Sequence, residues 1–139
     1  MPYPATLDHG DLHAGNVLIG HGGYWFFDWG DANITHPFCS LLLICHLLVR
    51  DFASGDGQRR IARLRDAYLE PWSTYTPARL LRPFFAAALW VAHVGRALDW
   101  HHMLTGTGEA ARAEWQPQVA RWLRTWLERR ELLWTGSSP

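Results

Sequence analysis

The sequence contains no lysine, and its 13 basic residues, all of them arginine, are balanced by 13 acidic residues. A chain without net charge lacks the basic surface that draws a protein to nucleic acid or to an anionic membrane. Long hydrophobic runs are missing too, because the apolar segments 40–49 and 84–98 are shorter than the ~20 residues that cross a bilayer. We therefore expect neither nucleic acid nor a membrane as a partner.

Cysteine is scarce as well. Cys39 and Cys45 lie six residues apart in an apolar segment, and two such residues do not indicate a disulfide framework. Residues 1–5 carry neither the basic segment nor the apolar run of a secretory signal peptide. Both observations favour a cytoplasmic location. At 139 residues, the chain is expected to form a single domain that buries about 68% of its unfolded surface.

What the sequence does contain, near its start, is two strand-like runs around a glycine-rich turn. Residues 17–19 and 24–27 are aliphatic or aromatic, and three of the residues at 20–23 are glycines, which tolerate the positive φ of a tight reversal. The pattern predicts a β-hairpin. The residues before its first strand and after its second then lie at one end, so Asn16 and Asp28 become neighbours although twelve positions separate them.

Asp11 is expected to lie at the same end of the hairpin as Asn16 and Asp28. It lies five residues before Asn16, in a loop where Gly10 and Gly15 allow the backbone to turn sharply. Asp11, Asn16 and Asp28 thus bring two carboxylates and a carboxamide together. Oxygen donors of this kind suit a hard cation such as Mg²⁺, which keeps part of its water shell.

Two motifs around this site carry a resemblance to a known family. His9-Gly-Asp11-Leu-His-Ala-Gly-Asn16-Val-Leu, followed by the hairpin and by Phe-Asp28-Trp-Gly-Asp-Ala, resembles the aminoglycoside phosphotransferase family, which includes small-molecule kinases for antibiotics, choline and homoserine. The resemblance implies an α+β, mostly α fold, the C-terminal lobe of a protein-kinase-like enzyme. In that lobe, residues 1–36 form the catalytic loop and the metal-binding hairpin, and residues 37–135 form a helical bundle.

The resemblance also implies a role for each motif residue. Asp11 is the base that orients the acceptor hydroxyl and accepts its proton, and His9 braces the catalytic loop. Asn16 and Asp28 hold Mg²⁺ against the phosphates of ATP or GTP, and His13 is a further candidate for contact with the cofactor. The implied reaction transfers the γ-phosphoryl group to a hydroxyl of a small substrate, for which an amine-bearing compound is one candidate.

The missing lysine becomes informative at this point. Kinase-like transferases hold the nucleotide phosphates with a lysine of an N-terminal lobe and cover them with a loop. This chain has no lysine and only eight residues before His9, so we expect the C-terminal lobe alone, without its nucleotide-clamping lobe. A separate N-terminal lobe or a second copy of the chain is then an expected partner, because the missing lobe would leave apolar surface near the hairpin exposed.

The rest of the chain predicts helices separated by turns. Pro37 opens a helix to about residue 52 that is apolar almost all round, which favours the middle of a lobe. A second helix is expected over 58–69, and a third over 78–103 with a bend near Pro83. The last helix spans 109–133, where an internal proline leaves two helices with a break near residue 114 as an alternative.

Two other functions stay open at this stage. A lobe without the lysine and the covering loop could bind Mg²⁺ or a partner and transfer nothing, so a catalytically incomplete binding module is one alternative. The segment from Gly10 to Asn16 is also similar to the metal motif of calcineurin-like metallophosphoesterases, in which Asp and His hold two metals. That family needs further ligand motifs on later strands, whereas this sequence predicts one hairpin followed by helices.

Overall fold

The computed structural model describes residues 3–52 and 55–134, with the side chains of 129–134 left out. The described chain is mostly helical and contains two small antiparallel sheets, so the prediction of an α+β, mostly α fold is confirmed. It divides into two compact units, Met1–Arg82 and Pro83–Pro139. None of the described helices is long and apolar enough to span a membrane.

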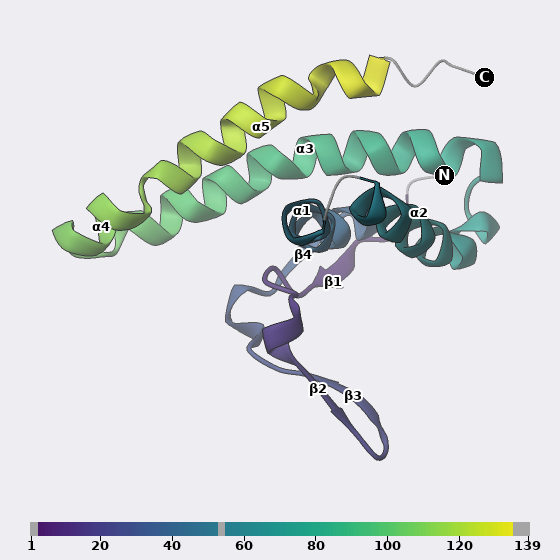
Figure 1. The fold of residues 1–139 in the computed structure, drawn as a ribbon, viewed down its shortest axis with the longest axis horizontal. Coiled ribbons are helices and arrows are strands. Elements are labelled where there is room, and N and C mark those ends of the chain that lie inside the picture. The colour runs from purple at the N-terminus through teal and green to yellow at the C-terminus, as the bar shows by residue number, and fades with distance from the viewer. Residues whose placement is uncertain (1–2, 53–54, 135–139) are drawn as a thin grey trace. The chain divides into compact units, whose positions relative to one another are not determined.

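The predicted hairpin is present in the first unit (Figure 1). Strand β2 (Val17–Gly20) pairs with β3 (Gly23–Phe26), and the register sets Val17 opposite Phe26 and Gly20 opposite Gly23. Of the residues at the turn, Gly23 is the one with positive φ, at 131°. Gly20 is needed for another reason, because a Cβ there would lie 2.7 Å from the ring of Trp25.

A second sheet, which the sequence did not predict, lies at the base of this hairpin segment. Strand β1 (Thr6–Asp8) runs antiparallel to β4 (Asn33–Thr35), with Leu7 opposite Ile34. The pairing joins the residues just before the predicted catalytic loop to those just after the predicted metal-binding segment. It therefore closes residues 9–32 into one loop system that carries all the predicted site residues.

After β4, the first unit continues with a 3₁₀ segment, Pro37–Leu41, which leads into α1 (Leu42–Asp51). The prediction of one helix from Pro37 was thus wrong in its first turn, where the ring of His36 accepts a hydrogen bond from the amide of Phe38. The prediction that this helix occupies the middle of a lobe was also wrong in part, because several side chains of α1 are half-buried and Val49 is 39% exposed. Helix α1 packs against α2 (Asp56–Leu69), the next α-helix along the chain.

Phe38 lies at the centre of the aromatic core of the first unit. It is fully buried and contacts the rings of Tyr3, His36, Tyr68 and Trp72. The hydroxyl of Tyr68 in α2 donates a 2.6 Å hydrogen bond to the carbonyl of the residue before Phe38. This cluster anchors the segment that follows β4, and so it fixes one end of the site loop.

The remaining helices agree closely with the predicted ranges. A 3₁₀ segment, Glu70–Thr74, precedes α3 (Ala78–Thr105), which continues through Pro83. The alternative of two final helices is confirmed: α4 (Glu109–Trp115) ends just before α5 (Pro117–Trp134), whose proline occupies the first helical position. Tryptophans pack the second unit, where Trp90 stacks on Trp126 with ring centroids 5.0 Å apart.

Candidate functional site

The predicted catalytic loop crosses the segment after the hairpin at Gly10. This residue has a φ of 77°, and a Cβ there would overlap the carbonyl oxygen of Asp31. The amide of Gly10 donates a 3.2 Å hydrogen bond to the carboxylate of Asp8 at the end of β1. Only glycine fits both the left-handed conformation and the close approach, so the path of the loop toward Asp11 depends on it.

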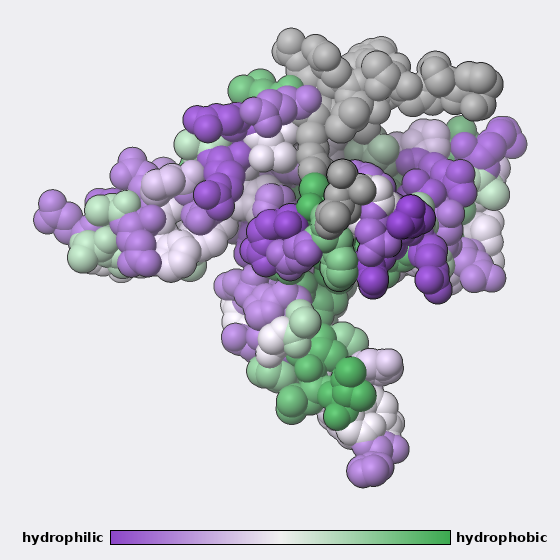
Figure 2. Space-filling model, in the orientation of Figure 1, coloured by the Kyte–Doolittle hydropathy of each residue, from purple (hydrophilic) through white to green (hydrophobic). Residues whose placement is uncertain are grey.

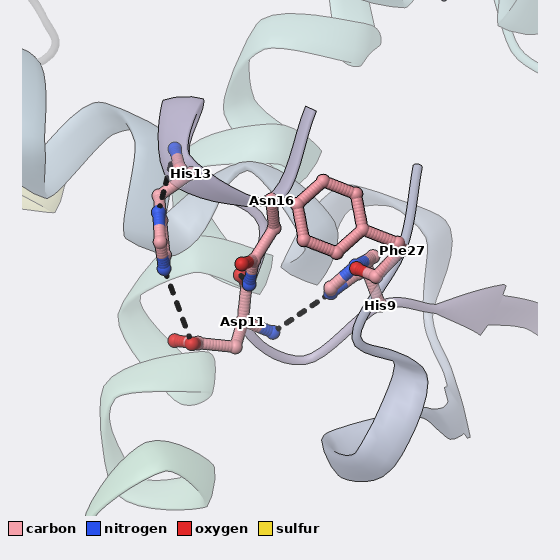
Figure 3. Close-up of polar contacts among 6 residues, drawn as sticks. His9, Asp11, His13, Asn16 and Phe27 are labelled. Carbon is pink, nitrogen blue, oxygen red and sulfur yellow. Dashed lines mark hydrogen bonds and ion pairs between the residues drawn. The ribbon is translucent and has the colours of Figure 1, made fainter. Parts of the chain in front are cut away.

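His9 ties the catalytic loop to the end of the hairpin. Its ring is buried, with 5% of the residue exposed, and Nδ1 accepts a 3.3 Å hydrogen bond from the amide of Asp11. Because Nδ1 is an acceptor, the proton of the neutral ring is on Nε2, which donates to the carbonyl of Phe27 at 2.9 Å. One side chain thus links the backbone of Asp11 to the residue that precedes Asp28 (Figure 3).

Asn16 makes the second link. Its side chain is buried, and Nδ2 donates a 3.0 Å hydrogen bond to the carbonyl of Asp11. Its own carbonyl accepts a 3.2 Å hydrogen bond from the amide of Phe27, which confirms that the two ends of the hairpin are neighbours. The carboxamide oxygen of Asn16 is then the side-chain atom that remains able to bind a cation.

Asp28 follows directly, in an unusual backbone conformation. It is the single non-glycine residue with positive φ in the part of the chain that the structure describes, with φ 63° and ψ 60°. Left-handed backbone costs an L-residue about 1–2 kcal/mol, although Asp tolerates it better than most. The indole of Trp29 donates a 2.9 Å hydrogen bond to the carbonyl of Phe26 and closes this turn. Strain of this kind is common where a functional side chain must point in one direction.

His13 lies on the other side of Asp11. Its Nε2 is 3.5 Å from Oδ2 of Asp11, and its Nδ1 accepts a 3.0 Å hydrogen bond from the amide of Gly15. Both side chains are about one-third exposed, at 38% for His13 and 32% for Asp11. The carboxylate of Asp11 is therefore accessible to a substrate hydroxyl while its backbone is held from two sides.

Hydrogen bonds and one ion-pair approach link four of the five predicted site residues, namely His9, Asp11, His13 and Asn16. Asp28 adjoins them through the backbone of Phe27, whose carbonyl accepts a hydrogen bond from His9 and whose amide donates one to Asn16. Within the described ranges, no group of three or more His, Cys, Asp or Glu side chains could hold a metal ion. The amide oxygen of Asn16 and the carboxylate of Asp28 are hard oxygen donors, and this set fits Mg²⁺, which binds through few protein ligands together with phosphate oxygens and water.

Comparison with known protein families identifies the first part of the chain. The model of the phosphotransferase enzyme family matches residues 1–81. This span is more than half of the 139 residues and contains the catalytic loop, the hairpin, α1 and α2. Neither a curated protein nor a solved structure matches the chain.

Proposed function

We propose that this chain, which belongs to the phosphotransferase enzyme family, is the catalytic-loop lobe of a small-molecule kinase. Enzymes of this family transfer phosphoryl groups and generally use ATP and Mg²⁺. The proposed reaction moves the γ-phosphoryl group of ATP or GTP to a hydroxyl of a small substrate in the cytoplasm. The observation that carries the proposal is the hydrogen-bond network around Asp11. His9 and Asn16 each bind a backbone group of Asp11, while its carboxylate is partly exposed, and His9 also binds the carbonyl of Phe27, next to Asp28.

Asp11 acts on the acceptor in this proposal. Its carboxylate accepts a hydrogen bond from the substrate hydroxyl, orients that oxygen toward the γ-phosphorus and takes the proton as the new P–O bond forms. The bond between the γ-phosphorus and the bridging oxygen breaks, and the nucleoside diphosphate leaves. Buried His9 and Asn16 hold the loop in place, since each binds one backbone group of Asp11.

Asn16 and Asp28 hold the metal in the proposed site. Both residues lie at the open end of the hairpin, where the amide of Phe27 donates a hydrogen bond to the carbonyl of Asn16, so a cation bound to both would be fixed relative to the Asp11 loop. Mg²⁺ bound at this site would neutralise negative charge on the oxygens of the transferred phosphoryl group. The left-handed backbone of Asp28 is consistent with a carboxylate that must face one direction.

The hairpin supports the proposal of a partner. Its side chains are apolar and exposed, with Leu18 at 61%, Ile19 at 77%, Tyr24 at 67% and Trp25 at 51%. Figure 2 shows this hydrophobic surface along the hairpin. Exposed apolar patches of this kind mark interaction sites. We assign the surface to a separate nucleotide-clamping lobe, because that lobe would also bring the phosphate-binding lysine that this sequence lacks. A second copy of the chain is the other candidate.

The alternative function is a binding module that holds Mg²⁺ or a partner without transferring phosphate. The exposed hairpin favours it, since an interaction surface requires no catalysis. Turnover separates the two functions, because a module of this kind binds Mg²⁺–ATP and leaves the nucleotide intact.

The test is a thermal melt with and without Mg²⁺–ATP, for the unmodified chain and for Asp28→Ala. A ligand at a hundredfold excess over its Kd stabilises the folded state by about 2.7 kcal/mol, which is a readily measured shift in Tm. We expect the shift in the unmodified chain and its loss in Asp28→Ala. Asp31→Ala is the matched control, because Asp31 is an exposed acid of the same turn and is not a proposed ligand. A shift that survives Asp28→Ala would contradict the proposed metal site.

A further inference from the structure

We propose that an open cavity between the end of α2 and the start of α3 binds a zwitterionic small molecule, such as an α-amino acid with an apolar side chain. The cavity has a volume of about 610 Å³, and small-molecule sites in proteins typically measure ~300–1,000 Å³. Residues between 66 and 82 line it, so it belongs to the first unit and lies outside the site loop of residues 9–32. The proposal therefore does not depend on phosphoryl transfer.

The two walls of the cavity carry opposite charges. The end of α2 and the 3₁₀ segment that follows it contribute the acids Asp66 and Glu70, which are four residues apart. The first five residues of α3 contribute Arg79 and Arg82. A ligand that carries both an ammonium group and a carboxylate matches these walls better than a ligand with one charge, because each end meets the opposite sign.

One acid–base pair across the cavity is already joined. Both carboxylate oxygens of Asp66 are occupied, since Oδ1 accepts a 2.8 Å hydrogen bond from Arg65 and Oδ2 accepts a 3.0 Å hydrogen bond from Arg82. The bond from Arg82 runs from α3 to α2 and connects the two walls. The charges of Asp66 and Arg82 are thus satisfied within the protein, which leaves the other pair for a ligand.

The other pair consists of Glu70 and Arg79. Both side chains line the cavity, and within the described part of the chain neither takes part in an ion pair. Ser73 adds an acceptor on the acidic wall, because its hydroxyl donates a 2.7 Å hydrogen bond to the carbonyl of Glu70 and keeps its lone pairs. A ligand ammonium group therefore meets a carboxylate and a hydroxyl oxygen on one wall, and a ligand carboxylate meets a guanidinium on the other.

The floor between the walls is apolar and packed. Leu69 and Leu81 line the cavity with only 3% and 5% of their surfaces exposed, and the methyl group of Ala78 lies beside them. An apolar side chain of the ligand can lie on this floor, whereas a further charged group there would lose water without gaining a partner. The cavity also offers as many acidic as basic groups, so it does not favour a polyanion such as a nucleotide.

The first test uses L-leucine as the probe, titrated at millimolar concentrations into the ¹⁵N-labelled chain and followed by the NMR signals of the backbone amides. We expect saturable shifts that are largest at Ser73, Ala78 and Arg79. The comparison compounds are 3-methylbutylamine, which is leucine without the carboxylate, and 4-methylpentanoate, which is leucine without the ammonium group. Each should bind about threefold more weakly than leucine, or weaker still, because it makes one ion pair instead of two. Binding of either compound as tightly as leucine would overturn the proposal.

The second test removes one charge from each wall. Glu70→Gln and Arg79→Gln should each raise the Kd for leucine by about threefold or more. In Glu70→Gln, leucine should also lose its advantage over 4-methylpentanoate, and in Arg79→Gln its advantage over 3-methylbutylamine. All of these side chains are exposed, so the substitutions are expected to leave the fold intact.

The matched controls are Arg63→Gln and Glu114→Gln, because both residues are exposed and lie outside the cavity. They should leave the Kd for leucine unchanged. Shifts centred elsewhere in the chain, an absence of saturable shifts, or an equal loss of affinity in the control variants would each overturn the proposal.

Discussion

Replacement of Asn16 by Ala tests how the catalytic loop is held. The side chain of Asn16 has 6% of its surface exposed and donates a 3.0 Å hydrogen bond to the carbonyl of Asp11. A typical hydrogen bond contributes about 0.5–1.5 kcal/mol to stability, and a buried partner left without one costs about 1–3 kcal/mol. Asp11 as a residue is half-buried, so its carbonyl can recruit water and we expect a loss of about 1–2 kcal/mol in the free energy of unfolding.

The assay is equilibrium denaturation in urea. With a slope of about 2 kcal/mol per molar urea, a loss of this size lowers the midpoint by roughly 0.5–1 M. Asn33→Ala is the matched control, because Asn33 lies in β4 with its side chain exposed, and exposed substitutions change stability by no more than about 0.5 kcal/mol. Equal midpoints for Asn16→Ala and Asn33→Ala would refute the account of the loop as held by the Asn16 side chain.

Gly10→Ala should lower the free energy of unfolding by at least about 2 kcal/mol in urea denaturation, because the new Cβ combines left-handed strain with overlap of the Asp31 backbone; an unchanged midpoint would contradict the close approach. Burial raises the pKa of Tyr68 above its ordinary value, so the folded state keeps the phenol neutral to higher pH than the unfolded chain does. The stability that Tyr68 contributes is therefore fully present below about pH 10 and is lost as the pH rises further. Tyr68→Phe should lower the urea midpoint at pH 8, because the hydrogen bond to Pro37 is lost, and should flatten the decline between pH 9.5 and 11; an equal decline in both proteins would contradict this assignment.

The hairpin could be predicted because its local signals agree. Apolar runs of strand length flank a turn that needs glycine, and the observed register follows from the turn. The β1–β4 sheet gave no such signal. Its strands have three residues each, and Leu7 and Ile34 face each other while 60% and 69% exposed, so no alternation of apolar and polar residues marks a buried face. These strands are separated along the sequence by the whole site loop, so their pairing depends on how that loop folds rather than on the residues of the strands themselves.

The site residues could be named from the motifs, whereas most of the contacts that hold them could not. His9 acts through the carbonyl of Phe27, and Asn16 acts through the carbonyl of Asp11. Every residue has a carbonyl, so no residue type in the sequence points to these acceptors. The left-handed backbone of Asp28 was equally hidden, because Asp is common in many conformations. In contrast, the glycine at position 10 did indicate a sharp turn, and its φ of 77° confirms one.

Among the helices, too, some boundaries could be predicted from local residues, whereas others depend on packing with distant parts of the chain. The start of α2 and the break before α5 follow from local residues, since glycine allows the φ of 96° at Gly55 and proline fixes φ and removes a backbone donor. The 3₁₀ turn before α1 depends instead on His36, whose ring caps the amide of Phe38 while packing on its side chain. That geometry comes from the aromatic core of the unit, which periodicity along the chain does not encode.

In the proposed site, Asn16 and Asp28 hold a divalent cation beside Asp11. Mn²⁺ binds the same oxygen donors as Mg²⁺ and broadens NMR signals of nearby nuclei, so a titration with Mn²⁺–ATP locates the metal directly. We predict that the amides of Asn16 and Asp28 broaden first and that Asp28→Ala abolishes the effect, whereas Asp31→Ala retains it. Broadening centred elsewhere in the chain, or unaffected by Asp28→Ala, would contradict the account.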